Sequence, residues 1–347
     1  MPSEPKQLAD VVLPTEAFLK MPAVYRLSAN ILYYIFLVNT LSENDFLKFY
    51  DYFVIPATSL DTARKTSQVC TAWRHIMLSS SFIWANSLHT SYLLEKYRPW
   101  FEEVIERTGS APLSIIHCER YHYQMGYSFF VSFLTDNWSR IRRIYLQIHS
   151  ITEAEYSSIL ANFYRKSSQL EIFNHSGVGS VRPKFDPSHG LFAGVSPLLR
   201  QFSVLNVPFS LLPILTHITI IRLHACFIGK EFLLALAHMK SLESLVITDP
   251  HTSFQISDSD VISNKWSTIQ LPALRYIQLD TIFKHFFWIM HAIDPCSKRL
   301  AQIDLEMRGD DIHIQSIWQL SKNVCLFTYA QHSKDNTPSI SIFLTRV

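Results

Sequence analysis

One short apolar template recurs along most of the chain and constrains its fold more than any other feature. The template is L-x-x-L-x-L, with any apolar residue allowed at the leucine positions, and after Pro112 it recurs at intervals of about 26 residues. These short runs predict strands, while the stretches between them have apolar residues three to four positions apart, which predicts helices. The matches begin at Leu113, Ile141, Leu170, Leu199, Ile218, Leu242, Leu274, Leu300 and Val324.

Strand, turn and helix repeated in this order predict an open right-handed solenoid, in which each unit buries its apolar face on its neighbours. The predicted helices lie in SFFVSFLTDNW, TEAEYSSILANFYRK, GKEFLLALAHM, FKHFFWIMHAI and HIQSIWQLSK. One unit, ITIIRLHACFI, also fits the longer pattern L-x-x-L-x-L-x-x-N/C-x-L, with Cys226 at the N/C position. The array therefore resembles an irregular leucine-rich repeat.

The chain before Pro112 has helical rather than strand periodicity. Residues 1–20 form an irregular lead that contains several prolines. A first helix is predicted after it, with Ser28 as its N-cap. Its apolar positions follow one helical face, and they are Leu27, Ile31, Ile35 and Val38.

Two further helices are predicted in this region. One covers residues 63–77, after a loop around Pro56, and Asp61 or Thr62 is expected to cap it. The other covers residues 93–107, and Gly109 is expected to end it, because glycine adopts the left-handed conformation common after a helix.

Two segments of this helical region together resemble the F-box. YRLSANILYYIFLVNTL is similar to its usual opening, L-P-x-E-I-L-x-x-I-F, and TSQVCTAWRHIMLSSSFIW is similar to its second half, V-C-R-x-W-R-x-I-A…L-W. WFEEVIERTGSAPLSI resembles the segment that follows the F-box in many fungal F-box proteins. The resemblance covers residues 21–120 by motif and the remainder by pattern alone.

The resemblance implies an α/β fold class, with an N-terminal all-α three-helix F-box followed by an irregular leucine-rich-repeat-like α/β solenoid. The F-box domain would cover residues 21–90, a linker helix 91–111 and the solenoid 112–347. The protein would then be the substrate-recruiting adaptor subunit of an SCF-type cullin–RING ubiquitin ligase. The motif residues expected to bind the Skp adaptor, and through it the cullin, are Leu27, Ile31, Leu32, Ile35, Phe36, Val69, Cys70, Trp73, Ile76 and Trp84.

A target protein would bind the strands. Side chains alternate between the two faces of a strand, so the non-core positions of the template share one face. They include Arg143, Tyr145, Arg222, His224, Tyr276 and Asp304. A sheet face that is merely solvated is the alternative. A second alternative is a non-catalytic interaction scaffold that does not engage the ligase, since Ser28 and Asn30 stand where the F-box has Pro and Glu.

Charge and composition argue against several other classes of protein. The chain carries 31 basic and 29 acidic residues, so it lacks the excess of basic charge typical of nucleic-acid binding. Its longest apolar runs, ILYYIFLV and FSLLPILTHITII, are shorter than the roughly 18 residues that span a membrane. The five cysteines form no CxxC pair. A cytoplasmic or nuclear protein without a membrane anchor is expected.

No catalytic motif stands out in the sequence. With only 8 glycines, the chain has no GxGxxG, GxxxxGK[ST] or GxSxG motif. The histidines and acidic residues allow weak metal-site hypotheses in HCERYH, which contains His117, Cys118 and His122, and in RGDDIHI, which contains Asp310, Asp311 and His313. We expect no enzyme activity, no cofactor and no metal.

Overall fold

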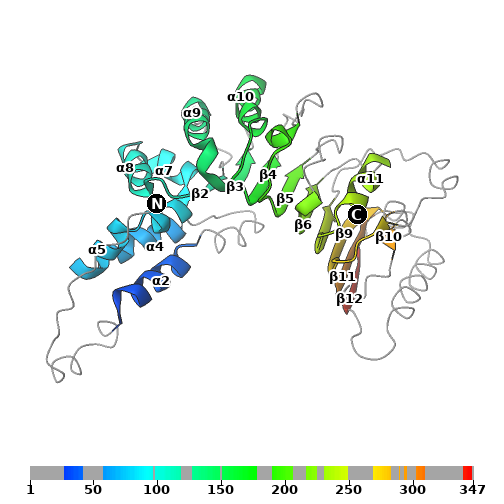
Figure 1. Ribbon diagram of the computed structural model, residues 1–347, viewed down its shortest axis with the longest axis horizontal. Coiled ribbons are helices and arrows are strands. Elements are labelled where there is room, and N and C mark those ends of the chain that lie inside the picture. Colours follow the sequence, from blue (N-terminus) through cyan, green and yellow to red (C-terminus); the bar gives the residue numbers. More distant parts are fainter. Residues whose placement is uncertain are drawn as a thin grey trace.

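The computed structural model describes residues 27–41, 58–96, 98–118, 127–148, 151–177, 190–205, 216–224, 230–248, 269–282, 289, 293–294, 302–308 and 339–345. Figure 1 shows parallel strands that follow one another in an arc, with helices at one end and along the outer side.

The first part of the chain forms short helices that pack on one another. Helix α2 contacts α4, α5 and α6, and α6 contacts α8. Ser28 is the N-cap of α2, as the sequence predicts, and its Oγ accepts a hydrogen bond from Ile31 N at 3.4 Å. The helices are α2 (Ala29–Asn39), α4 (Thr58–Thr66), α5 (Thr71–Ser79), α6 (Ser81–Asn86), α7 (Thr90–Lys96) and α8 (Arg98–Thr108).

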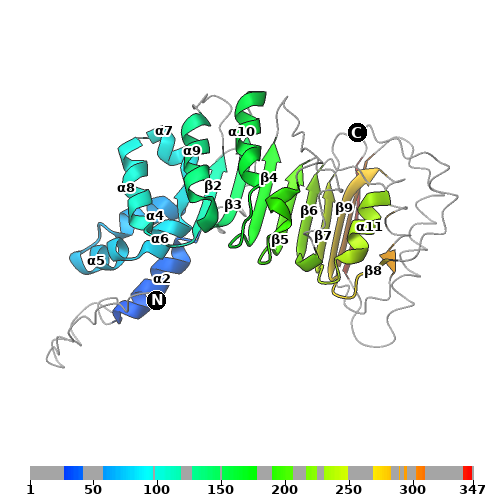
Figure 2. The same ribbon diagram turned by 45° about the horizontal axis from the view of Figure 1, so that its top comes forward.

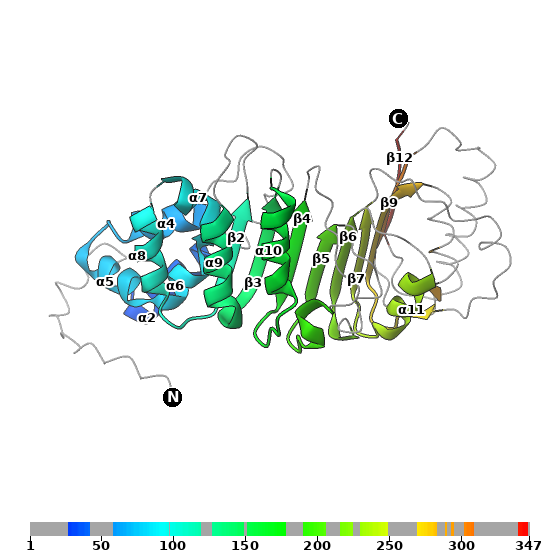
Figure 3. The same cartoon turned by 90° about the horizontal axis from the view of Figure 1, so that it is seen from above.

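A ten-stranded, entirely parallel sheet forms the body of the molecule, and its strand order follows the chain (Figure 3). Its strands are β1 (Leu88–His89), β2 (Leu113–Cys118), β3 (Ile141–Ile148), β4 (Ile172–Gly177), β5 (Gln201–Leu205), β6 (Ile220–His224), β7 (Ser244–Thr248), β9 (Tyr276–Ile282), β11 (Gln302–Arg308) and β12 (Ser339–Thr345). A separate parallel pair joins β8 (Ile269–Gln270) to β10 (Ile293–Asp294).

Further helices lie between the strands. They are α9 (Tyr127–Asn137), α10 (Glu153–Phe163), α11 (Lys230–His238) and the 3-10 helices η2 (Trp138–Arg140) and η3 (Leu191–Gly194). Helices α9 and α10 lie side by side on the outer side of the arc (Figures 1 and 2). Helix α10 begins with a capping box, because Thr152 and Glu155 satisfy each other's backbone N–H groups.

The register of the strands separates two faces of the sheet. One apolar row crosses it on the face that α9 and α10 cover, and we call this the helix-covered face. That row is Ile115, Ile144, Phe173, Phe202, Ile221, Leu245, Ile277, Ile303 and Ile340. The next residue of each strand points to the opposite side, which we call the open face.

Aromatic rings fill the core beneath the helices. The ring of Phe173 lies 4.9 Å from that of Phe163 in α10 and 5.2 Å from that of Phe192 in η3. Trp138 is buried beside them, and its Nε1 donates a hydrogen bond to Lys166 O at 3.1 Å. Burial of such large rings removes much apolar surface from water and is the main source of stability here.

The predicted fold class, an all-α three-helix F-box followed by a separate solenoid, is wrong. The protein is an α/β fold in which the N-terminal helices and the parallel sheet share one continuous hydrophobic core, from Leu32 to Ile293. Strand β1 directly follows α6, and α6 and α7 both contact β2. The short helices bury their apolar inner sides against the end of the sheet, so they do not form a domain of their own.

Local helix predictions are partly corrected as well. The single helix expected over residues 63–77 is two helices, α4 and α5, since Cys70 is extended at φ −157° and ψ 171°. Both Asp61 and Thr62 lie inside α4 rather than at its cap. The helix expected over residues 93–107 is likewise divided into α7 and α8. Gly109 follows α8 with a φ of +50°, as predicted.

The strand predictions are confirmed for each template from Leu113 to Leu300, because each begins at or just before one of the strands β2–β7, β9 and β11. The helices predicted in SFFVSFLTDNW, TEAEYSSILANFYRK and GKEFLLALAHM are α9, α10 and α11. The template at Val324 and the helix in HIQSIWQLSK lie outside the described residues. Of FKHFFWIMHAI only Ile289 and Ile293 are described; Ile289 is helical, whereas Ile293 begins strand β10. Strand β12 was not predicted.

Candidate functional site

Helix α2 carries apolar side chains on two sides. Leu32 and Phe36 are buried against the other helices. Four further apolar residues face outward at i, i+3, i+4 and i+7, which places them on one helical face. This surface, which we call the α2 surface, consists of Ile31, Tyr34, Ile35 and Val38, exposed by 49, 64, 41 and 57%. In Figure 1, α2 lies at the outside of the helical group.

More exposed apolar side chains come from the helices that pack on α2. Val69 lies between α4 and α5, Leu78 in α5 and Phe82 in α6, and all three are exposed. Seven of the ten large exposed apolar side chains among the described residues thus fall within residues 31–82. Such clustering of exposed apolar groups marks surfaces that bind another protein.

The structure divides the residues predicted to bind the Skp adaptor into three groups. Ile31, Ile35 and Val69 are exposed, whereas Leu27, Cys70, Trp73 and Ile76 are half-buried. Leu32, Phe36 and Trp84 are buried in the hydrophobic core, so a partner cannot reach them in this structure. Sequence reasoning missed Tyr34, Val38, Leu78 and Phe82 as candidate contacts, although the helical spacing of Tyr34 and Val38 relative to Ile31 was a readable signal.

The buried members of this set support the exposed ones. The Phe36 ring packs on the ring of Trp73 with centroids 4.8 Å apart, which joins α2 to α5. Trp84 is fully buried, and its Nε1 donates a hydrogen bond to Met77 O at 2.8 Å. These contacts fix the helices that carry the α2 surface.

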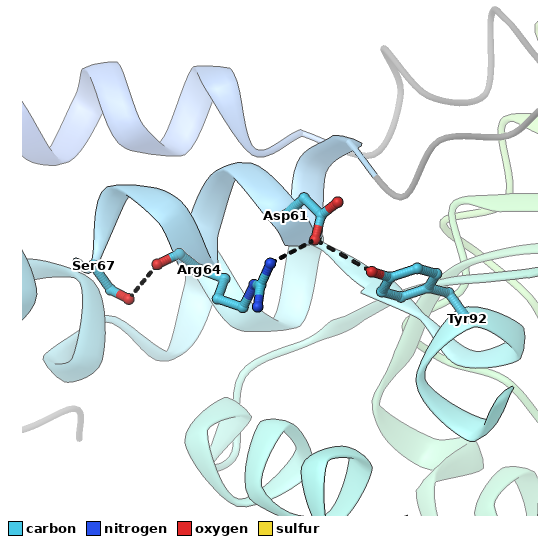
Figure 4. A network of polar contacts seen from close by, with 4 residues as sticks. All are labelled: Asp61, Arg64, Ser67 and Tyr92. Atoms are coloured by element: carbon cyan, nitrogen blue, oxygen red, sulfur yellow. Dashed lines mark hydrogen bonds and ion pairs between the residues drawn. The ribbon is translucent and has the colours of Figure 1, made fainter. Parts of the chain in front are cut away.

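A cavity of about 590 Å³ opens beside this group of helices, lined mainly by polar residues of α4, α5, α7 and α8. Figure 4 shows the contacts along one wall. Tyr92 donates a hydrogen bond to Asp61 Oδ1 at 3.4 Å, and Asp61 lies 3.8 Å from the Arg64 guanidinium. Ser67 Oγ donates to Arg64 O at 2.6 Å. The network connects α7 to α4 across the cavity.

The open face of the sheet brings the residues predicted to bind a target onto one side. Its central row crosses nine strands and mixes polar with apolar groups. The row is Ile116, Tyr145, Asn174, Ser203, Arg222, Val246, Gln278, Asp304 and Ser341. Arg143 and Tyr276 lie two positions before this row in their strands, and His224 lies two positions after it.

The six predicted target-binding residues differ in how far a partner can reach them. Tyr145 is buried against Ile116 and Ile172 and is exposed by only 2%, so a partner cannot reach it in this structure. The other five are partly exposed. Arg143 lies 4.0 Å from the carboxylate of Glu171, which also pairs with Arg142 at 2.9 Å.

A hydrogen-bond network occupies one part of the open face. Tyr276 donates to Asp304 Oδ2 at 2.9 Å and lies 3.1 Å from Gln278 Oε1. Gln302 Nε2 donates to the same oxygen of Asp304 at 2.9 Å. Burial, and after it the hydrogen bond to Asp304, raises the pKa of Tyr276 to about 12. The hydroxyl therefore stays protonated and remains a donor at neutral pH.

Two histidines lie on opposite faces of the sheet but have the same charge state. His224, on the open face, hydrogen-bonds to Thr248, and burial followed by the charge of Arg222 lowers the pKa of His224 to about 4. His175, on the helix-covered face, lies 3.2 Å from the Tyr156 hydroxyl, and burial lowers its pKa to about 4. Both rings are neutral at pH 7.

Among the described residues, no three His, Cys, Asp or Glu side chains lie together in a group that could hold a metal ion. His117 is buried and hydrogen-bonds to Thr90 at 2.9 Å, and burial lowers its pKa to about 3. His122 and the Asp310, Asp311 and His313 group lie outside the described residues. In the described part of the chain no helix is long and apolar enough to span a membrane.

The comparisons with known proteins identify no family for this chain. No protein-family model matches the chain, and no curated protein matches it either.

Proposed function

We propose that this protein is a non-catalytic adaptor that binds two other proteins at once. The α2 surface would bind a Skp-type adaptor of a cullin–RING ubiquitin ligase, and the open face of the sheet would bind a target protein. The protein would make no covalent bond itself. Tethering would raise the effective concentration of the target near the ligase.

The observation that carries this proposal is the exposed apolar surface of α2. A helix whose inner side already fills a core gains nothing by itself from four apolar residues on its outer side. Ile31, Tyr34, Ile35 and Val38 expose between 41 and 64% of their surface to water. Burial against a partner would return about 25 cal/mol for each Å² of apolar surface removed from water.

The choice of partner comes from the sequence. Ile31, Ile35 and Val69 are exposed. They also occupy apolar positions in the two stretches that resemble the F-box motif, and the Skp adaptor binds that motif. Their exposure is what a binding role requires, since a partner contacts only accessible side chains.

The test is co-purification of the full chain with a Skp adaptor. Wild type is compared with a double variant, Ile31→Asp with Ile35→Asp, which places two charges on the outer side of α2. The buried neighbours Leu32 and Phe36 are unchanged, so the helix keeps its packing. Leu234→Asp is the matched control, because Leu234 is also an exposed apolar residue of a helix, at 52% exposure in α11.

We expect wild type and the Leu234→Asp control to capture the adaptor and the double variant to lose it, with circular dichroism unchanged. Capture by the double variant at the wild-type level would remove α2 from the interface. No capture by folded wild type would favour the interaction scaffold that does not engage the ligase.

A further inference from the structure

Arg222 lies near the middle of the open face, on the sixth strand of the ten-stranded sheet. Its neighbours in the central row are Ser203 on β5 and Val246 on β7, and neither carries a charge. The Nη1 atom of Arg222 is buried and has no hydrogen-bond partner. The residue as a whole keeps partial exposure.

Two other charged groups on this face have partners. Asp304 accepts hydrogen bonds from Tyr276 and Gln302, and Arg143 lies 4.0 Å from Glu171. His224 is neutral at pH 7, since its pKa is about 4. Arg222 differs from them, because no counter-ion among the described side chains contacts it.

An unpaired guanidinium nitrogen in a buried position is costly, because the protein provides no replacement for the lost water. Arg222 Nη1 is one of ten buried side-chain nitrogen and oxygen atoms without a hydrogen-bond partner among the described residues, whereas in folded proteins most such atoms have one. A group left unsatisfied on a face that no described helix covers points to a partner from outside the chain.

We propose that Arg222 is the anchor of a binding site for an acidic segment of the target protein, in which an aspartate or glutamate side chain pairs with the guanidinium. This inference rests on the proposed function, because it names the kind of target that the open face recruits. The planar guanidinium matches a carboxylate and can hold both of its oxygens.

A singly charged carboxylate fits this site better than a phosphate dianion. Arg222 is the only arginine of the central row, and Asp304 lies three strands further along it, beyond Val246 and Gln278. Asp304 raises the pKa of Tyr276 and Arg222 lowers it, so both charges act on the same hydroxyl. A second negative charge on the ligand would be repelled by Asp304.

The test uses random peptides displayed on phage and selected on the full chain. Selected peptides are resynthesised with free or amidated C-termini, and with each Asp or Glu replaced by its amide. Their affinities are measured by titration against wild type, Arg222→Gln and Arg200→Gln. Arg200 is the matched control, because it is an exposed arginine placed just before β5 rather than in the central row.

We expect the selected peptides to share an internal acidic residue whose amide replacement weakens binding roughly tenfold to a hundredfold, as loss of a charge-assisted hydrogen bond does. Arg222→Gln should weaken binding by a similar factor and Arg200→Gln should not. Equal binding to Arg222→Gln, dependence on the C-terminal carboxylate, or selection of no peptide would each overturn the proposal.

Failure of this inference can be told apart from failure of the proposed function. Capture of the Skp adaptor by Arg222→Gln is measured in parallel, and it should equal that of wild type. If wild type captures no adaptor but acidic peptides bind through Arg222, the ligase role fails and the carboxylate site stands. If adaptor capture succeeds and peptide binding ignores Arg222, the reverse holds.

Discussion

The two faces of the same sheet differ sharply in the side chains that they carry. On the helix-covered face, one row of nine residues is entirely apolar, from Ile115 to Ile340. One residue along each strand, the open face carries amide, hydroxyl, guanidinium and carboxylate groups. The alternation of a strand keeps these sets apart, so polar groups on the open face vary without cost to the core.

The largest effect is expected when an aromatic ring is removed from the helix-covered face. Phe173→Ala should lower the free energy of unfolding by about 3–5 kcal/mol, because it leaves a cavity among Phe163, Phe192 and Phe202. Denaturant unfolding measures the change. Gln201→Ala, on the open face, is the control and should change stability by less than about 0.5 kcal/mol. Equal effects would mean that the faces are wrongly assigned.

The second test uses the buried histidine of the helix-covered face. Because the folded-state pKa of His175 is about 4, below its ordinary value of 6.5, the unfolded chain binds the proton first as pH falls. The stability that depends on neutral His175 is present above pH 6.5 and is lost toward pH 4, on the order of 3 kcal/mol.

Unfolding followed across this pH range measures the loss. His175→Leu should make the dependence shallower, while buried His117 and His224 still contribute to it. His238→Leu, at the exposed end of α11, should keep the wild-type slope. An unchanged slope in His175→Leu would show that His175 is not held neutral in the core.

A smaller effect is expected from the hydroxyl network of the open face. Tyr276→Phe removes the hydroxyl that donates a hydrogen bond to Asp304 Oδ2, while Gln302 Nε2 still donates to that oxygen. We expect a loss of about 1 kcal/mol in the free energy of unfolding, typical of one hydrogen bond. A loss as large as that of Phe173→Ala would show that the open face contributes as much to stability as the helix-covered face.

The smallest effect is a change in one pKa. Arg222 lowers the pKa of His224, so Arg222→Gln should raise it from about 4, while the pKa of His175 on the opposite face should stay at about 4. Titration of the histidine ring signals by NMR measures both. A shift of both histidines would indicate a general loosening rather than a local charge effect.

Much of the sheet was predictable, because its strands repeat a short apolar pattern. Phe202 and Val204, or Ile221 and Leu223, occupy the apolar template positions and are buried. The template failed in β2, where Ile115 rather than Ile116 joins the core, and the pairing of β2 with β3 shifts by one residue at Arg142. A one-residue shift of this kind exchanges the two faces and leaves no mark in the apolar pattern.

That the N-terminal helices and the sheet share one core was not predictable from the local sequence pattern. The helical spacing of Leu32 and Phe36 reveals an amphipathic helix but not what it packs against. The same holds for the candidate sites: spacing placed Ile31 and Ile35 on one helical face, yet only the tertiary structure separates them from buried Trp84. The unpaired state of Arg222 depends on groups from neighbouring strands, which a single sequence does not bring together.

The strand order of the sheet bears on how the chain reaches this structure. From β1 to β7 each strand pairs with the one made just before it, and β9, β11 and β12 continue the series. During synthesis, β3 can therefore join β2 before β4 exists, and no strand has to wait for a distant partner. Growth by addition at one edge would let the molecule assemble in the order in which the ribosome releases it.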